Sequence, residues 1–238
     1  MNAKHPMIDH INTRLEALAD LPTAAILRRF FKTGPGEYGE GDRFRGIRVP
    51  VLRKLCREFR HAGVEVISEL LDSLWHEDRM LALLLLIERY RASSESGREE
   101  LYDFYCSRSD RVNNWDLVDV SCPHIVGNHL NTRDRSPLYR FIESSNLWER
   151  RIAIVSTFHF IRNDDFGDTL DLAERLLTDP EELLHKATGW MLREVGKRSQ
   201  SQLEAFLDRH ATAMPRTMLR YSIERFPEDE RKGWLRRS

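Results

Sequence analysis

The sequence has 238 residues, of which 41% are hydrophobic and 32% are charged. This composition supports a buried core beneath a hydrated surface, and it excludes a chain that is disordered throughout. Thirty-seven Lys and Arg residues nearly balance 38 Asp and Glu residues, so the net charge of −1 excludes a globally basic nucleic-acid binder but permits a locally basic face.

Apolar residues recur at helical spacing along almost the whole chain. The first stripe joins Ile8, Ile11, Leu15 and Leu18, and no segment alternates Val, Ile or Thr between Asn-Gly or Asp-Gly turns as a hairpin strand would. The sequence therefore predicts an all-α protein. The expected helices cover residues 8–19, 23–32, 50–59, 64–74, 76–91, 98–107, 113–121, 123–130, 137–143, 148–162, 166–177, 181–197, 202–211, 215–225 and 228–235.

The one long stretch without helical spacing, Thr33–Arg48, contains five glycines. Its backbone N–H groups could face a phosphate, but it lacks the Gly-Lys-Ser/Thr ending of a nucleotide-triphosphate loop, and Glu37 and Glu40 would repel phosphate. We therefore exclude a nucleoside triphosphatase and expect a connection between helices, whose Arg43 and Arg45 could contact a ligand. No linker separates two domains, so a single domain over residues 1–238 is expected.

The segment from Ile26 to Arg60 is basic, because it holds ten Lys and Arg residues against four Asp and Glu residues. A locally basic surface is what contact with a phosphate backbone requires. A solvated helix face explains the same charges without a ligand, so the charge pattern alone leaves both interpretations open.

Short motifs recur at related spacings in the helical segments. Arg79–Ala82 is followed 71 positions on by Arg150–Ala153 and 36 positions further on by Lys186–Gly189. Each motif places a small residue three positions after a basic one, which lets neighbouring helices approach closely. Because 71 is close to twice 36, a further unit is expected around Trp115–Asp119. The spacing favours an α-solenoid, or superhelix, of HEAT-like repeats with a concave basic face over an irregular helical bundle.

The sequence shows no signal for a membrane, a secretory pathway or a metal. The longest wholly apolar run, Met80–Ile87, has eight residues, whereas a membrane helix needs about 20. The start of the chain, Met1–Pro6, lacks the apolar stretch of a secretory signal. Cys56, Cys106 and Cys122 form no CxxC pair, so neither a disulfide framework nor a zinc site is predicted. We expect a soluble, cytoplasmic protein.

The segment Asn113–Asp119 is the most informative for chemistry. Trp115 and Asp119 lie four positions apart and therefore share one face of a helix. A carboxylate beside an indole suits a cationic ligand, because the ring face attracts the cation and the carboxylate supplies the opposite charge. A core tryptophan beside a solvated aspartate explains the pair as well, and Asp116 could cap the helix or pair with an arginine.

Trp190 follows Gly189 inside a predicted helix, where glycine costs about 1 kcal/mol relative to alanine. Either a neighbouring helix or a ligand is therefore expected to approach the backbone closely there. If the helices stack in register, Trp115, Arg151 and Trp190 are expected to converge on one surface. Competing catalytic patterns such as His-Glu-x-x-His and Gly-x-Ser-x-Gly are absent from the sequence.

Four segments, Phe44–Pro50, Trp115–Asp119, Leu147–Arg151 and Gly189–Glu194, occur in an order that spans most of the chain. In these motifs the sequence resembles the AlkD-like DNA alkylation repair enzymes, which are DNA glycosylases built from HEAT-like repeats. The resemblance implies hydrolysis of the N-glycosidic bond of cationic N-alkylated purines, such as 3-methyladenine and 7-methylguanine, in double-stranded DNA. It also implies that the damaged base is not flipped into a pocket, unlike in most glycosylases.

The resemblance also assigns roles to individual residues. Asp119 matches the catalytic aspartate, Trp115 and Trp190 match the paired tryptophans at the lesion, and Arg151 matches a phosphate-contacting arginine. The implied enzyme acts as a monomer and needs no metal or organic cofactor. Further DNA contacts are expected from Phe30, Arg43, Arg45, Arg48 and Arg193.

One departure from the family pattern concerns the N-terminal helix, where the family often has a tyrosine near the site. The corresponding segment here is Arg28–Phe31, which carries no hydroxyl group. This difference from the family pattern affects the expected lesion preference and the expected rate of base excision. Two other functions therefore stay open: non-catalytic binding of damaged or branched DNA on the same scaffold, and a HEAT-type scaffold for protein interactions.

Overall fold

The computed structural model describes residues 6–237, and the described chain is built of helices joined by turns and loops. The pairing of Arg43 with Trp75 is an isolated bridge rather than a strand. The prediction of an all-α protein is confirmed. Met1–His5, on which the expectation of no secretory signal rests, lie outside the described residues. Within residues 6–237, no helix has both the length and the apolar character needed to cross a bilayer.

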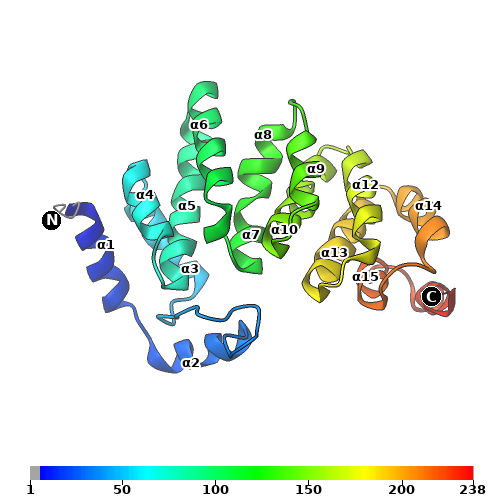
Figure 1. Cartoon of the computed structure of the whole chain (residues 1–238), viewed down its shortest axis with the longest axis horizontal. Helices are drawn as coiled ribbons and strands as arrows, with labels where there is room; N and C mark the ends of the chain where they lie inside the picture. Colours follow the sequence, from blue (N-terminus) through cyan, green and yellow to red (C-terminus); the bar gives the residue numbers. More distant parts are fainter. Residues whose placement is uncertain (1–5, 238) are drawn as a thin grey trace. The chain divides into compact units, whose positions relative to one another are not determined.

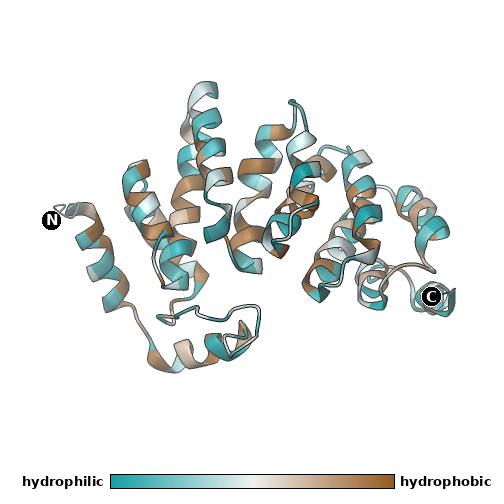
Figure 2. Ribbon diagram, in the orientation of Figure 1, coloured by the Kyte–Doolittle hydropathy of each residue, from teal (hydrophilic) through white to brown (hydrophobic). Residues whose placement is uncertain are grey.

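The chain forms two compact units, Met1–Ser121 and Cys122–Ser238. Figure 1 labels the helices along the chain. The boundary falls within helical structure, which is why no linker in the sequence marks it. In both units the helices carry hydrophobic residues on some faces and hydrophilic residues on others, as the helical spacing predicts (Figure 2).

The first unit packs around a long central helix, α5. Helices α3, α4, α6 and α7 all contact α5, and its apolar run Met80–Ile87 is buried throughout. The run that was too short for a membrane helix is therefore the core of this unit. The helices of the unit are α1 (Pro6–Ala17), α2 (Leu21–Phe30), α3 (Val49–Glu58), α4 (Val64–Leu71), α5 (His76–Ala92), α6 (Glu95–Ser107), the 3-10 turn η1 (Ser109–Arg111) and α7 (Trp115–Ser121).

Capping residues explain why two of these helices, α2 and α6, begin earlier than predicted. Asp20 accepts a hydrogen bond from the Thr23 amide, so α2 starts at Leu21. Ser94 accepts one from the Gly97 amide, so α6 starts at Glu95, between the predicted helices 76–91 and 98–107. Side-chain acceptors at these positions satisfy amide groups that the first helical turn leaves unpaired.

The second unit contains stacked helix pairs. Its elements are the π-helix η2 (Pro123–Gly127), α8 (Asn128–Leu130), α9 (Ser136–Ile142), α10 (Leu147–Ser156), α11 (Phe158–Ile161), α12 (Gly167–Arg175), η3 (Leu176–Thr178), α13 (Glu182–Arg198), α14 (Gln200–His210), α15 (Arg216–Ser222) and α16 (Glu228–Arg237). The helix expected over residues 148–162 is interrupted at Thr157, which separates α10 from α11.

The motifs spaced by 36 residues occupy equivalent helices in this unit. Arg150–Ala153 lies on α10 and Lys186–Gly189 lies on α13. Helix α10 packs against both α9 and α13, and α12 packs against α9 and α13, so the α9–α10 and α12–α13 pairs stack. The predicted helical-repeat fold is therefore confirmed, and it arises because each pair buries its apolar face against the next.

Gly189 marks a close contact between helices. A Cβ atom at this position would lie 2.5 Å from the Met218 carbonyl oxygen and 2.5 Å from the Tyr221 Cβ on α15. Of the two explanations offered by the sequence, a neighbouring helix accounts for the glycine.

Candidate functional site

Trp115 is the first residue of α7, and it is half-buried against aromatic side chains. Its indole stacks on Phe31 with ring centroids 5.3 Å apart, and Phe30 meets it edge-on at 5.9 Å. Its Nε1 donates a hydrogen bond of 3.3 Å to the Tyr38 hydroxyl. Trp115 thus packs against Phe30 and Phe31 and remains partly exposed to solvent.

Asp119 lies one helical turn after Trp115 on the same face of α7 and is also half-buried. Leu117 and Ser121 are buried on the opposite side of the helix, and Val118, which flanks this face, is buried as well. The structure therefore brings Trp115 and Asp119 together as the sequence predicted, at a place that solvent reaches.

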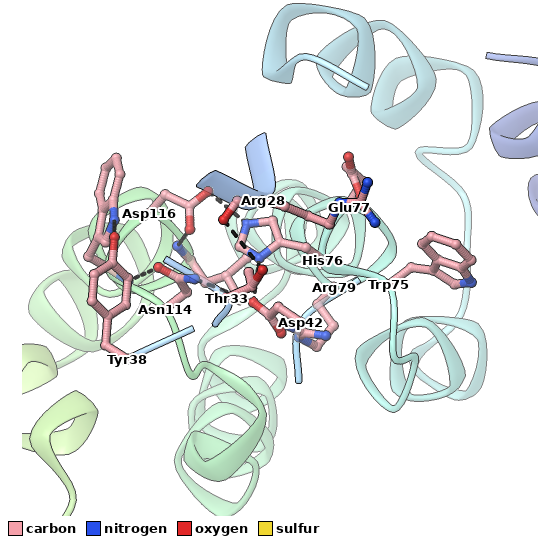
Figure 3. Close-up of polar contacts among 12 residues, drawn as sticks. Arg28, Thr33, Tyr38, Asp42, Trp75, His76, Glu77, Arg79, Asn114 and Asp116 are labelled. Atoms are coloured by element: carbon pink, nitrogen blue, oxygen red, sulfur yellow. Dashed lines mark hydrogen bonds and ion pairs between the residues drawn. The ribbon is translucent and has the colours of Figure 1, made fainter. Parts of the chain in front are cut away.

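Asp116 pairs with a histidine rather than with an arginine. Its Oδ2 lies 2.8 Å from His76 Nε2, and its Oδ1 accepts a 2.9 Å hydrogen bond from the Leu117 amide. The buried Asn114 accepts a hydrogen bond from the Trp115 amide and donates one of 3.3 Å to Asp42. The first turn of α7 is therefore held by side chains of its own and of distant segments (Figure 3).

His76 lies between two carboxylates, as Figure 3 shows. Its Nδ1 is 3.0 Å from Asp42 Oδ2, its Nε2 contacts Asp116, and the residue is only 3% exposed. Carboxylate oxygens only accept hydrogen bonds, so both ring nitrogens must carry protons. Burial lowers the pKa of His76, but the charges and hydrogen bonds of Asp116 and Asp42 outweigh it and raise that pKa to about 9.

A second cation completes this cluster, because the Arg79 guanidinium also pairs with Asp42. Burial on its own would raise the pKa of Asp42, but His76 and Arg79 hold it below its usual value. Two cations thus face two carboxylates, Asp42 and Asp116, in a buried position where an unbalanced charge would be costly.

The glycine-rich loop satisfies its own amide groups. Glu37 accepts a 2.7 Å hydrogen bond from the Gly34 amide, and Glu40 accepts one of 2.8 Å from the Gly36 amide. Those amides are therefore not aimed at a phosphate, in agreement with the exclusion of a nucleotide-triphosphate loop.

A hydroxyl group reaches Trp115 even though Arg28–Phe31 carries none. The loop brings Tyr38 to the indole, and Gly39 makes this possible, since a Cβ at residue 39 would lie 2.3 Å from the Phe31 carbonyl oxygen.

The predicted DNA contacts of the first unit differ in accessibility. Phe30 is 59% exposed, and Arg43 and Arg48 are exposed as well. Arg45 is different, because its guanidinium forms hydrogen bonds of 2.7 and 3.0 Å with Asp78 and lies 4.7 Å from the centre of the Trp75 ring. With its side chain only 10% exposed, Arg45 joins the loop to α5 through Asp78.

The predicted site residues of the second unit are more enclosed. Trp190 on α13 is half-buried, and its Nε1 donates a 3.1 Å hydrogen bond to Glu194. Arg151 on α10 is 5% exposed and donates a 2.6 Å hydrogen bond to the Leu183 carbonyl, so contact with a phosphate requires its side chain to shift. Arg193 pairs with Glu224.

Sequence reasoning missed Tyr38, Asp42, His76 and Asn114. Their contacts join positions that are 34 to 77 residues apart, so helical spacing carries no signal for them. The tyrosine within a glycine-rich loop was the one available hint. Within residues 6–237, no three His, Cys, Asp or Glu side chains gather as metal ligands would.

Comparison with known proteins places the chain in a family. The family model described as "DNA alkylation repair enzyme" matches residues 11–226. No curated protein matches the sequence. A solved structure described as a "Predicted DNA alkylation repair enzyme from Enterococcus faecalis" is similar over 88% of this chain and 97% of that chain, with a TM-score of 0.67 and 17% identity, which shows a shared fold. Since the family model covers most of its length, the chain belongs to the DNA alkylation repair enzyme family.

Proposed function

We propose that this protein is a monofunctional DNA glycosylase that hydrolyses the N-glycosidic bond of cationic N-alkylated purines, such as 3-methyladenine and 7-methylguanine, in duplex DNA. The observation that carries the proposal is the pair formed by Trp115 and Asp119 on α7. Both side chains are half-buried and one turn apart, in a chain of the DNA alkylation repair enzyme family. An indole beside a carboxylate suits a substrate that is positively charged.

The proposed reaction does not require a strong general acid. An alkylated purine already carries a positive charge, so it leaves with the electron pair of the glycosidic bond as a neutral base. Its departure develops positive charge on the deoxyribose, as in other glycosidic cleavages. Water then bonds to the anomeric carbon and gives up a proton.

We assign the stabilisation of that charge to Asp119. Its carboxylate supplies the opposite charge and orients the attacking water. Trp115 faces the sugar and excludes bulk water, with a cation–π attraction of roughly 0.5–2 kcal/mol. We propose a similar role for Trp190 of the second unit. Following the family resemblance, the damaged base stays in the duplex rather than entering a pocket.

Exposed cations of the first unit are proposed to contact the DNA backbone. Arg43 and Arg48 fit this role because they are exposed, and Phe30 offers an apolar surface beside Trp115. Arg45 is left out because its release would leave the buried carboxylate of Asp78 without a cation, whereas Glu224, the partner of Arg193, is exposed and the partner of Arg151 is an uncharged carbonyl. For the second unit we retain Arg151 and Arg193 as proposed contacts, each after release from its present partner.

Base release from methylated duplex DNA tests the proposal. We expect the wild-type protein to release 7-methylguanine, and we expect Asp119→Asn to abolish release while duplex binding stays nearly intact. The substitution keeps the shape of the side chain and removes its charge. Equal release by the two proteins would rule out Asp119 as the catalytic carboxylate.

The same experiment separates the alternatives. Salt-sensitive DNA binding without base release by the wild-type protein would favour a non-catalytic DNA binder, the alternative raised by the absence of a hydroxyl group in Arg28–Phe31. DNA binding whose strength does not change with salt concentration would instead favour a scaffold for protein partners, because contact with the phosphate backbone is salt-dependent.

A further inference from the structure

The glycine-rich loop Thr33–Arg48 contacts the first turn of α7 at successive positions. Asp42 accepts a hydrogen bond from Asn114, and Tyr38 accepts one from the Trp115 indole. Asp42 also reaches Asp116 through His76. Glu37 and Glu40 already accept hydrogen bonds from amide groups within the loop. A loop that only connected two helices would therefore not need the additional hydrogen bonds to residues 114–116.

We propose that this loop is a working part of the site, in which Tyr38 and the Asp42–His76–Asp116 bridge are positioning residues that fix the indole of Trp115. The contribution to catalysis rests on the proposed glycosylase function. The fixing of the indole does not, and it can be measured without a substrate.

Stacking alone leaves the Trp115 ring underdetermined. Contact with Phe31 restrains the plane of the indole, but stacking carries no preference for which edge of the ring faces the loop. The hydrogen bond from Nε1 to Tyr38 supplies that preference, since it requires one edge of the indole to point at the loop.

Tyr38 is itself anchored. Its hydroxyl accepts from Trp115 and donates a hydrogen bond of 3.4 Å to the Phe30 carbonyl oxygen, so one group uses both its donor and its acceptor capacity. The exposed end of α2, the loop and α7 are thereby joined at one hydroxyl. Gly39 holds the loop close to Phe31, as described above.

The charged bridge fixes the backbone beneath the indole. Asp116 directly follows Trp115, and His76 belongs to the buried helix α5, so the bridge ties the start of α7 to the core of the unit. Arg79 balances the second carboxylate. A charge-balanced, hydrogen-bonded network of this kind favours one geometry, because any other arrangement leaves a buried charge without a partner.

The test uses Tyr38→Phe, which removes the hydroxyl and keeps the ring. In a ¹H–¹⁵N spectrum, the indole N–H signal of Trp115, assigned with Trp115→Phe, is expected to move as its hydrogen bond is lost. The other indole signals are expected to stay in place. In the base-release assay, we expect kcat to fall roughly two- to tenfold, the range of one lost hydrogen bond, while KM for DNA is unchanged.

Tyr139→Phe is the matched control. Tyr139 on α9 donates a hydrogen bond to Asp168 in the second unit, so this variant loses a tyrosine hydroxyl elsewhere. It is expected to leave both the Trp115 signal and kcat unchanged.

The outcomes separate the two proposals. An unmoved Trp115 signal in Tyr38→Phe overturns the fixing of the indole. A moved signal with unchanged kcat overturns the contribution to catalysis. If the wild-type protein releases no base, the glycosylase proposal fails, and the moved signal by itself still supports the role of Tyr38 in holding the indole.

Discussion

At the scale of single residues, the partners of a charged side chain decide what it does. Arg45 and Arg48 are three positions apart in the same basic segment, yet Arg45 is half-buried and ion-paired with Asp78, whereas Arg48 is exposed. His76 could pass for an ordinary core histidine in the sequence, but two carboxylates make it a buried cation. Charge counts along the chain cannot distinguish these cases.

Replacing Arg45 is expected to affect stability rather than DNA binding. Arg45→Met leaves Asp78 buried without its cation, which costs about 3 kcal/mol in the free energy of unfolding. Arg48→Met is the control and is expected to change stability by less than about 0.5 kcal/mol, as exposed substitutions do. Urea denaturation measures both. Similar stability of the two variants would show that the Arg45–Asp78 pair does not hold the fold.

The His76 cluster predicts that stability depends on pH. The folded-state pKa of about 9 lies above the ordinary value of 6.5, so the stabilisation is complete below pH 6.5 and is lost as the pH rises through 9. The groups facing His76 are Asp42 from the loop, Asp116 from α7 and, through Asp42, Arg79 of its own helix.

Urea denaturation at a series of pH values measures this loss. The free energy of unfolding of the wild-type protein is expected to fall by on the order of 3 kcal/mol between neutral and alkaline pH. His76→Gln is expected to be less stable at neutral pH and to lose less on alkalinisation. Equal alkaline losses in the two proteins would mean that His76 does not carry the effect.

At the scale of helices, small residues set how closely neighbours pack. Gly189 on α13 and Ala153 on α10 occupy corresponding positions of the repeated motif and are both buried. The spacing of 36 residues in the sequence is thus the separation along the chain between corresponding positions of α10 and α13.

Gly189→Ala is expected to destabilise the protein by roughly 1–3 kcal/mol. Its new methyl group meets the backbone of Met218, which cannot yield as a side chain would, and this overpacking outweighs the better helix propensity of alanine. Gly233→Ala on α16 is the control, because nothing lies within 4 Å of the new methyl group. It is expected to be neutral or to stabilise by up to about 1 kcal/mol. Thermal unfolding of both variants tests the contrast.

At the scale of the whole molecule, a nearly neutral chain must bind DNA through local charge. The net charge of −1 gives no overall attraction to a polyanion. We propose that exposed cations, Arg43 and Arg48 of the first unit among them, supply the electrostatic part of binding.

Salt dependence measures that contribution. For undamaged duplex DNA, the logarithm of the binding constant is expected to fall linearly with the logarithm of salt concentration, and Arg48→Met is expected to reduce the slope by about one. Arg45→Met serves as the comparison and is expected to leave the slope unchanged, provided that the assay temperature keeps this variant folded. A slope unaffected by Arg48→Met would remove Arg48 from the proposed contacts.

The sequence by itself determined the helical fold class, the repeat spacing and the placement of Trp115 and Asp119 one turn apart on a helix, because all three depend on periodicity along a single helix or between equivalent helices. The tertiary structure decided that Arg45 is an internal ion-pair partner, that Gly189 accommodates α15, and that Tyr38 and His76 hold the start of α7. These contacts join segments up to 77 residues apart, and their existence depends on how the chain packs rather than on any local pattern.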